Sequence, residues 1–329
     1  MKKIAVILSC LMLEGSLWAQ NDALVQRIAF PNEESRIEDD YLVHPYDLKV
    51  YKGSYYICDA EECCVKVFSA NGQFIRKIGR KGQGPGELGT TFKLDIDEES
   101  GLIYCADAGN SRIDVFESSG DFRGMIRTLV PPRDVICLKG TIITASYNRI
   151  LNSLYTMYDS QLRIAKTFGE LFDANVPNTP NGLYLYTMAN HAKEGSSLYV
   201  LFECLPFVSI YSLDGRLVNR LTIDNKDITS IYDKNIVGLK KGPVDGVLGV
   251  SPWNRGGCLY KGRYYYLADF KTDEVWEFDL NGKLSRKIPF RDKTRKATYR
   301  LVTVDNGKFI FLDWYSGQVQ VYEIEQMAR

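Results

Sequence analysis

The sequence predicts an all-β protein, a six-bladed β-propeller whose ring is closed by a strand near the N-terminus. Three observations support this prediction. Short runs rich in Tyr, Val, Ile and Phe are separated by Gly, Asn and Asp, and almost no stretch keeps a helical period of 3.6 residues. A pattern of four such runs occurs six times. The sixth copy lacks its fourth run, and a spare run, ALVQRIAF at 23–30, lies at the opposite end of the chain.

The repeat is clearest when residues 41–79 are aligned with 92–128. Each segment contains an apolar strand, a turn with Gly, a strand that ends in Asp, a polar turn, a strand that ends in Val-Phe, a second turn with Gly and a last strand. Closely similar copies occupy 256–290 and, for three strands, 299–324, and weaker ones occupy 134–169 and 183–223. The six copies are marked by their first-turn glycines, which are Gly53, Gly101, Gly140, Gly195, Gly262 and Gly307. Their mean spacing of about 51 residues suits one four-stranded blade.

Ring closure explains why the spare run lies at the N-terminus. An open row of blades would expose unpaired strand edges, and a strand from one end of the chain that completes the blade at the other end removes them. We therefore expect residues 20–329 to form a single six-bladed domain.

The first residues, MKKIAVILSCLMLEGSLWAQ, have the pattern of a signal peptide, with two lysines, a short apolar run and a small residue, Ala19, before a cleavage point. We predict that residues 1–19 are removed during export, so that the mature chain is periplasmic or extracellular. Lipid attachment at Cys10 is the alternative, because ILSC loosely resembles a lipid-attachment box, and it would anchor the protein to the outer membrane. The apolar run continues past Cys10, which favours ordinary cleavage.

Charge and hydropathy argue against two classes of partner. Basic and acidic residues number 41 each, so the chain has no net charge to attract nucleic acid. No second apolar run is long enough to span a membrane. We expect a monomer.

Seven of the eight cysteines follow the predicted signal peptide, which is a sparse and odd-numbered set. The compartment permits disulfides, but the fold does not require them. Cys63 and Cys64 are adjacent, as in a strained vicinal disulfide. The others lie in or beside predicted strands and are expected to be buried thiols: Cys58, Cys105, Cys137, Cys204 and Cys258.

One region supports a family resemblance. The segment GRKGQGPGEL, followed by LDIDEESGLIYCADAGNSRIDVFESSGDF, resembles the six-bladed β-propeller proteins related to NHL repeats, which are abundant among exported bacterial proteins. The resemblance is strongest over 42–128 and recurs over 256–324. It implies the fold. Such proteins include lyases, lactonases and plain binding modules, so the function has to be argued from sites.

The glycine-rich stretch 79–89, GRKGQGPGELG, raises the question of a phosphate-binding loop. GPGELG matches G-x-G-x-x-G, but a strand pattern follows it, where dinucleotide binding requires a helix N-terminus. We interpret the stretch as the connection from the first blade to the second. Its four later glycines, Gly82, Gly84, Gly86 and Gly89, permit positive φ angles.

An aspartate recurs at the end of the second strand of the repeat. It is present as Asp59, Asp107, Asp269 and Asp313, with Ser146 and Glu203 near the corresponding places in the weak copies. A carboxylate there can accept backbone N–H bonds from the following turn, so we expect a structural role.

Metal-dependent chemistry is constrained by the shortage of histidine. Only His44 and His191 are present. A resemblance to propeller lyases of the NHL type would imply a zinc site of three histidines, which two histidines cannot form. A gluconolactonase-like site would resemble a Glu, Asn and Asp set around a divalent cation, and no motif here brings three such ligands together. Calcium at the channel stays a possible cofactor because acidic loops are common in this fold, and no metal ligand or catalytic residue is assigned.

The two longest connections, 169–182 and 223–256, suggest a face rich in irregular loops, and such loops often carry function. By the repeat alignment, a group of aromatic and cationic residues lies in segments on this face. These predicted ligand-binding residues are Arg80, Lys81, Asn110, Arg112, Tyr147, Arg149, Trp253, Arg255, Trp314 and Tyr315.

Flat rings beside guanidinium groups suit sugars, carboxylated glycans or acidic peptides. The sequence therefore predicts an exported, non-catalytic propeller that binds a glycan, peptide or protein at its loop-rich face. The alternative is a metal (calcium)-dependent lactonase- or lyase-like hydrolytic enzyme with its site at the central channel.

Overall fold

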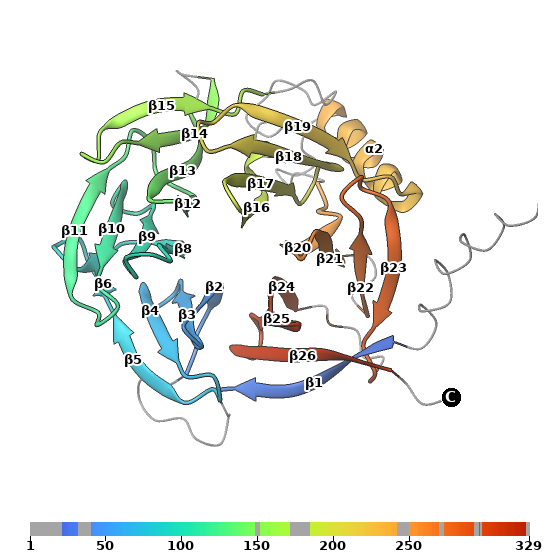
Figure 1. Cartoon of the computed structure of the whole chain (residues 1–329), viewed down its shortest axis with the longest axis horizontal. Helices are drawn as coiled ribbons and strands as arrows, with labels where there is room; N and C mark the ends of the chain where they lie inside the picture. The colour runs from blue at the N-terminus through green and yellow to red at the C-terminus, as the bar shows by residue number, and fades with distance from the viewer. Residues whose placement is uncertain are drawn as a thin grey trace, which may run out of the picture.

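Six four-stranded antiparallel sheets stand around a central channel (Figure 1). The structure is a computed structural model, and it describes residues 22–31, 41–148, 152–171, 185–241, 250–269, 273–292, 296 and 298–326. The all-β, six-bladed prediction is confirmed. The predicted signal peptide, with Cys10 and Ala19, and residue Arg149 lie outside the described residues.

Each blade runs from an innermost strand at the channel to an outermost strand at the rim. Blades 1 to 3 consist of β2 (Pro45–Tyr51), β3 (Ser54–Asp59), β4 (Cys64–Phe68) and β5 (Phe74–Ile78); β8 (Thr91–Ile96), β9 (Ile103–Asp107), β10 (Arg112–Phe116) and β11 (Phe122–Arg127); and β12 (Asp134–Leu138), β13 (Thr141–Asn148), β14 (Ser153–Tyr158) and β15 (Ile164–Phe168).

The other three blades have the same order. Blades 4 to 6 consist of β16 (Ala189–Glu194), β17 (Ser197–Phe202), β18 (Phe207–Ser212) and β19 (Leu217–Thr222); β20 (Asn254–Tyr260), β21 (Arg263–Ala268), β22 (Glu274–Phe278) and β23 (Leu284–Pro289); and β24 (Tyr299–Asp305), β25 (Lys308–Asp313), β26 (Gln318–Gln326) and β1 (Asp22–Phe30).

The N-terminal strand closes the ring as predicted. β1 lies antiparallel to β26 from Asp22 opposite Gln326 to Phe30 opposite Val319, so the first strand of the chain is the outermost strand of the last blade. Figure 1 shows the two strands side by side. Leu24 packs in the cluster between blades 5 and 6, and Phe30 packs in the cluster between blades 6 and 1. One strand therefore contributes to both apolar seams that flank the closure.

Successive connections alternate between the two faces of the disc because all strands within a blade are antiparallel. The turns after the second strand and the links from one blade to the next emerge on one face, which we call the loop face. Apart from Arg149, the predicted ligand-binding residues belong to segments on this face or at its edge, although the side chain of Trp253 is buried.

One of the two long connections is not irregular throughout. Residues Lys226–Lys241 form a helix, α2, which lies at the rim beside β19 and β23 (Figure 1). The Asn225 side-chain oxygen caps it by accepting the N–H groups of Asp227 and Ile228. Its buried residues Ile228, Ile236 and Leu239 lie on one face. The expectation of an irregular connection over all of 223–256 is therefore wrong, because these apolar residues recur at helical spacing and give the segment a face that can be buried.

The seven cysteines after the predicted signal peptide are free and buried. The vicinal pair Cys63 and Cys64 is not oxidised, and the Cys63 thiol lies 3.0 Å from the carbonyl oxygen of Gly89. Burial raises the pKa of the Cys64 thiol to about 12. None of the helices among the described residues is long and apolar enough to cross a membrane.

A chain that starts at residue 31 is expected to unfold at a much lower temperature than a chain that starts at residue 20. Removing β1 exposes the edge of β26, and losing the buried side chains of Leu24 and Phe30 is expected to cost about 2–5 kcal/mol each. Thermal unfolding followed by circular dichroism measures the difference. Equal melting temperatures for the two chains would show that closure by β1 is unimportant.

Candidate functional site

The main candidate site is a cavity of about 640 Å³ at the loop-face mouth of the channel. It lies on this face because its wall includes Ala108, from the turn after β9, and Ser146, near the end of β13. Aromatic and ionisable side chains dominate the wall. They are Tyr46, Phe92, Tyr147, Tyr155, Tyr186, Lys93, Arg133, Asp134, His191, Glu203 and Arg300.

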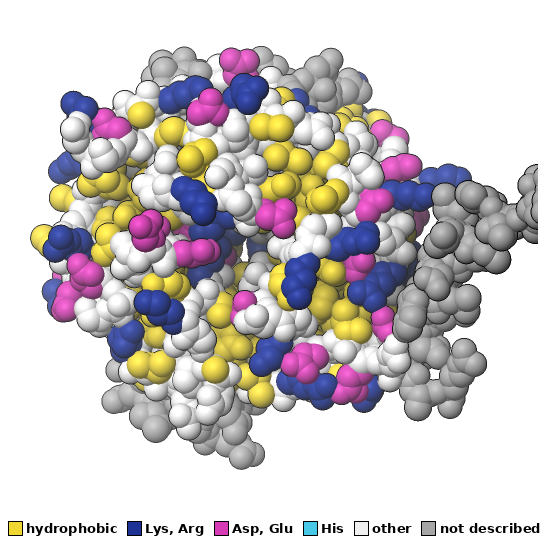
Figure 2. Space-filling view, in the orientation of Figure 1, with side chains coloured by type: hydrophobic (Ala, Val, Ile, Leu, Met, Phe, Trp, Pro, Cys, Tyr) yellow, Lys and Arg dark blue, Asp and Glu magenta, His cyan; other side chains and the backbone are white. Residues whose placement is uncertain are grey.

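The innermost strands place charges of alternating sign around the channel. Equivalent positions in the innermost strands of blades 1 to 3 are occupied by Asp47, Lys93 and Asp134. Each of these residues pairs with the residue directly before the position of the recurrent aspartate. Two residues further along the strand, the sign is reversed in the first two blades, with Lys49 and Asp95. Figure 2 shows a hollow at the centre of the disc bordered by basic and acidic side chains.

These charges are paired between different blades. Lys93 Nζ lies 3.6 Å from Asp47 Oδ1, and Lys193 Nζ lies 2.8 Å from Asp95 Oδ2. The same aspartates accept backbone N–H bonds from the next blade, 3.2 Å from Leu94 to Asp47 and 2.7 Å from Cys137 to Asp95. Each carboxylate therefore ties two blades together and neutralises a lysine in the channel wall.

His191 joins blades 3 and 4 at the floor of the cavity. Its Nδ1 lies 2.7 Å from Asp134 Oδ2, and its Nε2 lies 3.2 Å from the Tyr155 hydroxyl. A neutral ring that donates from Nδ1 to the carboxylate and accepts the tyrosine proton at Nε2 satisfies both contacts. Burial would raise the pKa of Asp134, but Lys93, His191 and Lys49 together hold it well below its usual range.

Arg300 forms the second polar cluster of the cavity. Its guanidinium forms an ion pair with Glu203, donates to Asn190 Oδ1 at 3.2 Å and lies 5.6 Å from the centre of the Tyr46 ring. Burial would lower the pKa of Arg300, but Glu203, Tyr46 and Asp47 raise it. Because β24 and β17 belong to blades 6 and 4, this ion pair crosses the channel mouth past blade 5.

Three of the four recurrent aspartates, Asp59, Asp107 and Asp313, accept backbone N–H bonds as the sequence predicted. Asp59 accepts the backbone N–H groups of Val43 and His44, at 2.8 and 3.2 Å. Asp107 accepts those of Gly89 and Thr90, at 3.0 and 3.1 Å. Each carboxylate therefore joins the turn after the second strand to the link that enters the same blade.

The cavity lies where this aspartate is replaced. Blade 3 has Ser146, whose hydroxyl donates to the carbonyl of Pro131 at 2.8 Å. Blade 4 has Glu203, whose longer side chain reaches Arg300 and accepts from Asn190 Nδ2 at 3.1 Å. Both replacements are visible in the sequence, but no site is predicted from them there. A departure from the repeat was the available signal, because a position that serves the site no longer needs to serve the blade.

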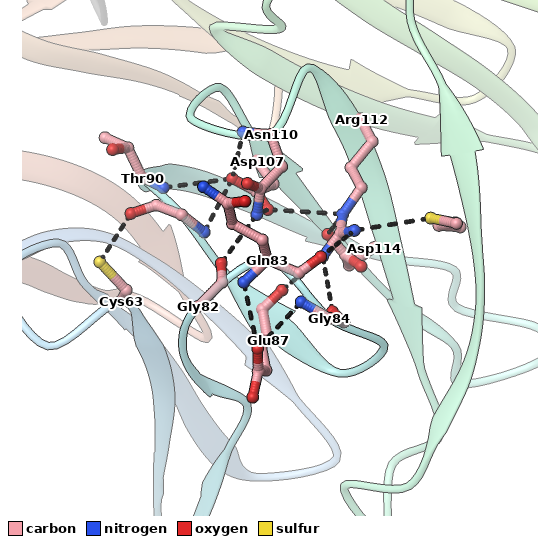
Figure 3. Close-up of polar contacts among 12 residues, drawn as sticks. Cys63, Gly82, Gln83, Gly84, Glu87, Thr90, Asp107, Asn110, Arg112 and Asp114 are labelled. Carbon is pink, nitrogen blue, oxygen red and sulfur yellow. Dashed lines mark hydrogen bonds and ion pairs between the residues drawn. The ribbon is translucent and has the colours of Figure 1, made fainter.

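Two of the predicted ligand-binding residues hold the glycine-rich link instead (Figure 3). Arg112 is 7% exposed and donates to the carbonyl oxygens of Gln83, Gly84 and Glu87, at 2.6 to 2.9 Å. Asn110 donates from Nδ2 to the carbonyl of Gly82 at 3.0 Å. The expectation for Arg112 is corrected, because its donors are taken up by backbone carbonyls and by Asp114.

The glycine-rich link has no vacant anion site. The Glu87 carboxylate accepts the N–H groups of Gln83 and Gly84, at 3.1 and 2.9 Å, and these bonds together with Arg80 lower its pKa. Gly86 adopts a φ of 74°, as predicted. A Cβ on Gly89 would lie 3.0 Å from the Asn110 amide, so this glycine is required for close approach rather than for a positive φ.

The other predicted residues differ widely in accessibility. Arg80 and Lys81 are exposed in the short strand β6 (Arg80–Lys81), which pairs with β7 (Glu87–Leu88). Tyr147 lines the cavity. Trp314 and Tyr315 are 54% and 89% exposed. Arg255 forms an ion pair with Asp269.

Trp253 requires a correction, because its side chain is completely buried. The indole Nε1 donates to the carbonyl of Leu205 at 3.1 Å, and the ring packs on Tyr266. Its backbone N–H donates to the carbonyl of Glu203 at 2.9 Å. Trp253 therefore supports the turn that carries Glu203 and offers no surface to a ligand.

Comparison with known proteins supports the same architecture. A family model described as a 6-bladed beta-propeller matches residues 37–168. Together with the six closed blades, that match decides the class. The chain is a six-bladed β-propeller. A comparison of the propeller with curated proteins gives no match.

Several solved structures share the propeller fold. A protein from Bacteroides fragilis, proposed to be exported, is 12% identical with a TM-score of 0.59, and the alignment covers 93% of this chain and 95% of that chain. A member of the DUF4221 family from Bacteroides vulgatus is 13% identical with a TM-score of 0.59, covering 93% and 99%. Virginiamycin B lyase from Staphylococcus aureus is 10% identical with a TM-score of 0.53, covering 85% and 95%. Identities this low show the propeller fold alone.

Among the described residues of the propeller, no three side chains of His, Cys, Asp or Glu are grouped so that they could hold a metal ion. The carboxylates of the channel are each engaged with a lysine, histidine or arginine. Calcium at the channel stays an expectation from the sequence.

Replacing Arg112 by Ala is expected to destabilise the propeller by about 3 kcal/mol, because buried Asp107 and Asp114 lose their cationic partner. Arg80→Ala on the same link removes an arginine whose side chain is 76% exposed, and it is expected to cost less than about 0.5 kcal/mol. Urea unfolding of both variants gives the comparison. Similar losses for both would show that Arg112 is not the anchor of this link.

Asp134→Asn should change how stability depends on pH. The folded-state pKa of Asp134 is lowered, so its ionised form stabilises the wild type above the ordinary aspartate pKa of about 4. That contribution is lost as the pH falls through the folded-state pKa of about 2. The free energy of unfolding is therefore expected to differ most between wild type and variant at pH 6–7, to differ less below pH 4, and to converge only near pH 2. A difference that is independent of pH would contradict the ion-pair network.

Proposed function

We propose that this protein is an exported binding protein whose ligand carries a negatively charged group and enters the loop-face cavity. The observation that carries the proposal is the composition of the cavity wall. Lys93, Arg133 and Arg300 face two carboxylates, Asp134 and Glu203, in a volume of about 640 Å³. That volume is within the range of about 300–1,000 Å³ typical of small-molecule sites. Asp47, which lies outside the lining, partly balances Lys93. The lining itself still has more cations than carboxylates, which favours an anion over a cation in a concave, partly desolvated site.

The state of Asp134 supports an anionic ligand. Its low pKa means that the surrounding lysines and histidine stabilise negative charge at the floor of the cavity more than burial opposes it. A ligand carboxylate is attracted by the same cations but repelled by Asp134 itself, so it is expected to approach Arg300 rather than the cavity floor. The guanidinium of Arg300 can bind a carboxylate through two parallel N–H donors.

The aromatic part of the wall supports a ligand that also has a flat, weakly polar surface. Tyr46 and Phe92 pack in a tilted arrangement with their ring centres 4.8 Å apart, and both line the cavity near Lys93. Aromatic side chains with two rotatable bonds provide contact area at a low entropic cost. A small acidic sugar or an acidic peptide side chain fits this combination.

Export is supported by two independent observations. The first 19 residues have the charge and hydropathy pattern of a signal peptide. A propeller of the same fold from Bacteroides fragilis is proposed to be exported. Mass spectrometry of the mature protein would test the proposal, since cleavage after Ala19 leaves a chain that begins at Gln20.

Catalysis at the channel is the second candidate function. It is favoured by one observation, the histidine at the cavity floor that lies between a carboxylate and a tyrosine hydroxyl. Such a histidine can accept or deliver a proton. Mass spectrometry of any bound compound after incubation with the protein separates the two functions, because a binding protein returns it unchanged.

Arg133→Ala is expected to weaken the binding of a carboxylated sugar by about tenfold or more, since a charged hydrogen bond contributes about 1.5–3 kcal/mol. Arg80→Ala is the matched control, because Arg80 is also an exposed arginine of the loop face but lies outside the cavity. Galacturonate and its methyl ester are suitable probes in isothermal titration calorimetry. Binding of the ester as tightly as the acid, or equal losses in the two variants, would contradict an anion site at this cavity.

A further inference from the structure

A line of aromatic side chains leads from the cavity across the loop face toward blade 6. Phe92 and Tyr46 line the cavity, His44 lies 6.4 Å from Tyr46 between ring centres, and Trp314 lies 6.3 Å from His44. We call these four residues the aromatic track. Phe92, Tyr46 and His44 are half-buried, and Trp314 is 54% exposed.

The outer end of the track is held by the recurrent aspartates. Asp59 accepts the backbone N–H of His44 at 3.2 Å, and it also accepts that of Val43. Asp313 accepts the backbone N–H of Tyr315 at 3.1 Å and the Ser316 hydroxyl proton at 2.7 Å, which fixes the turn that carries Trp314. An exposed indole on a fixed turn costs little conformational entropy when a ligand binds it.

The cavity offers cations and the outer part of the track offers aromatic rings, and this combination favours a saccharide over a peptide. The cations are at the inner end, where Arg300 lies over the Tyr46 ring at 5.6 Å. Toward the outer end the rings are edge-on or tilted to one another, with centres 6.3 to 6.4 Å apart, a spacing similar to the size of a sugar unit. A peptide held in extended form would need a row of backbone donors and acceptors, whereas a saccharide needs ring faces for its C–H surfaces and cations for its carboxylates.

We propose that the aromatic track binds an acidic oligosaccharide that contains uronic acid units, with one carboxylated unit in the cavity and further units over His44 and Trp314. This inference rests on the proposed function, since the cavity holds the first unit. It adds a prediction that the cavity alone does not make, namely that affinity increases with chain length.

The test is a length series of oligogalacturonates measured by isothermal titration calorimetry with the full mature chain. The tetramer is expected to bind about five- to tenfold more tightly than the dimer, the gain of about one aromatic stacking contact. Trp314→Ala is expected to abolish that gain and to leave dimer binding unchanged. The control is Tyr315→Ala, which removes the adjacent, 89% exposed ring outside the track and is expected to keep the gain.

Three results would overturn the track. Equal affinity for dimer and tetramer would overturn the track and leave the cavity proposal intact. A gain in affinity with length that is still present in Trp314→Ala would have the same two consequences. Tighter binding of an oligoglutamate of the same charge would assign the face to an acidic peptide. If neither galacturonate nor any oligomer binds, the proposed function itself fails, and that outcome is distinct because it removes dimer binding as well.

Discussion

The structure depends on the pairing of its first strand with its last. β1 and β26 are about three hundred residues apart in the chain, and their ladder from Asp22 to Phe30 is what converts a row of five complete blades and one incomplete blade into a ring. Only a closed ring brings the six innermost strands around one axis. The channel, its charges and the cavity at its mouth are therefore consequences of closure, because none of them exists within a single blade.

Closure brings charged side chains close together around the channel, and the innermost strands balance them by alternating their signs. Asp47, Lys93 and Asp134 occupy equivalent places in three successive blades, so each charge has an opposite neighbour. An unpaired charge at this depth would cost far more than an exposed one. The network also joins the blades, since Asp47 and Asp95 accept N–H bonds from the following blade. A ligand thus meets a wall whose side chains are already ordered.

The candidate site lies where the chain departs from the repeat. Where an aspartate ends the second strand, as at Asp59 and Asp107, its carboxylate accepts backbone N–H groups of the link into its own blade. Its oxygens are then engaged within the blade and do not face a ligand. Where Ser146 and Glu203 replace it, the link into the blade is held differently and the cavity opens. The aspartates that keep the structural role contribute indirectly, because Asp59 and Asp313 fix the outer half of the aromatic track. Regular positions support the site, and irregular ones form it.

The sequence by itself determined the blade count, the closing strand and the face on which the site was sought, because these follow from periodic patterns that each blade repeats locally. It did not determine which side chains are accessible. Trp253 and Arg112 have the chemistry of ligand-binding residues, yet one is in the core and the other holds the glycine-rich link. The partnership of Arg300 with Glu203, and that of His191 with Asp134, joins residues from different blades. Such contacts have no local signature, since they depend on the radius and register of the closed ring, which only the tertiary structure fixes.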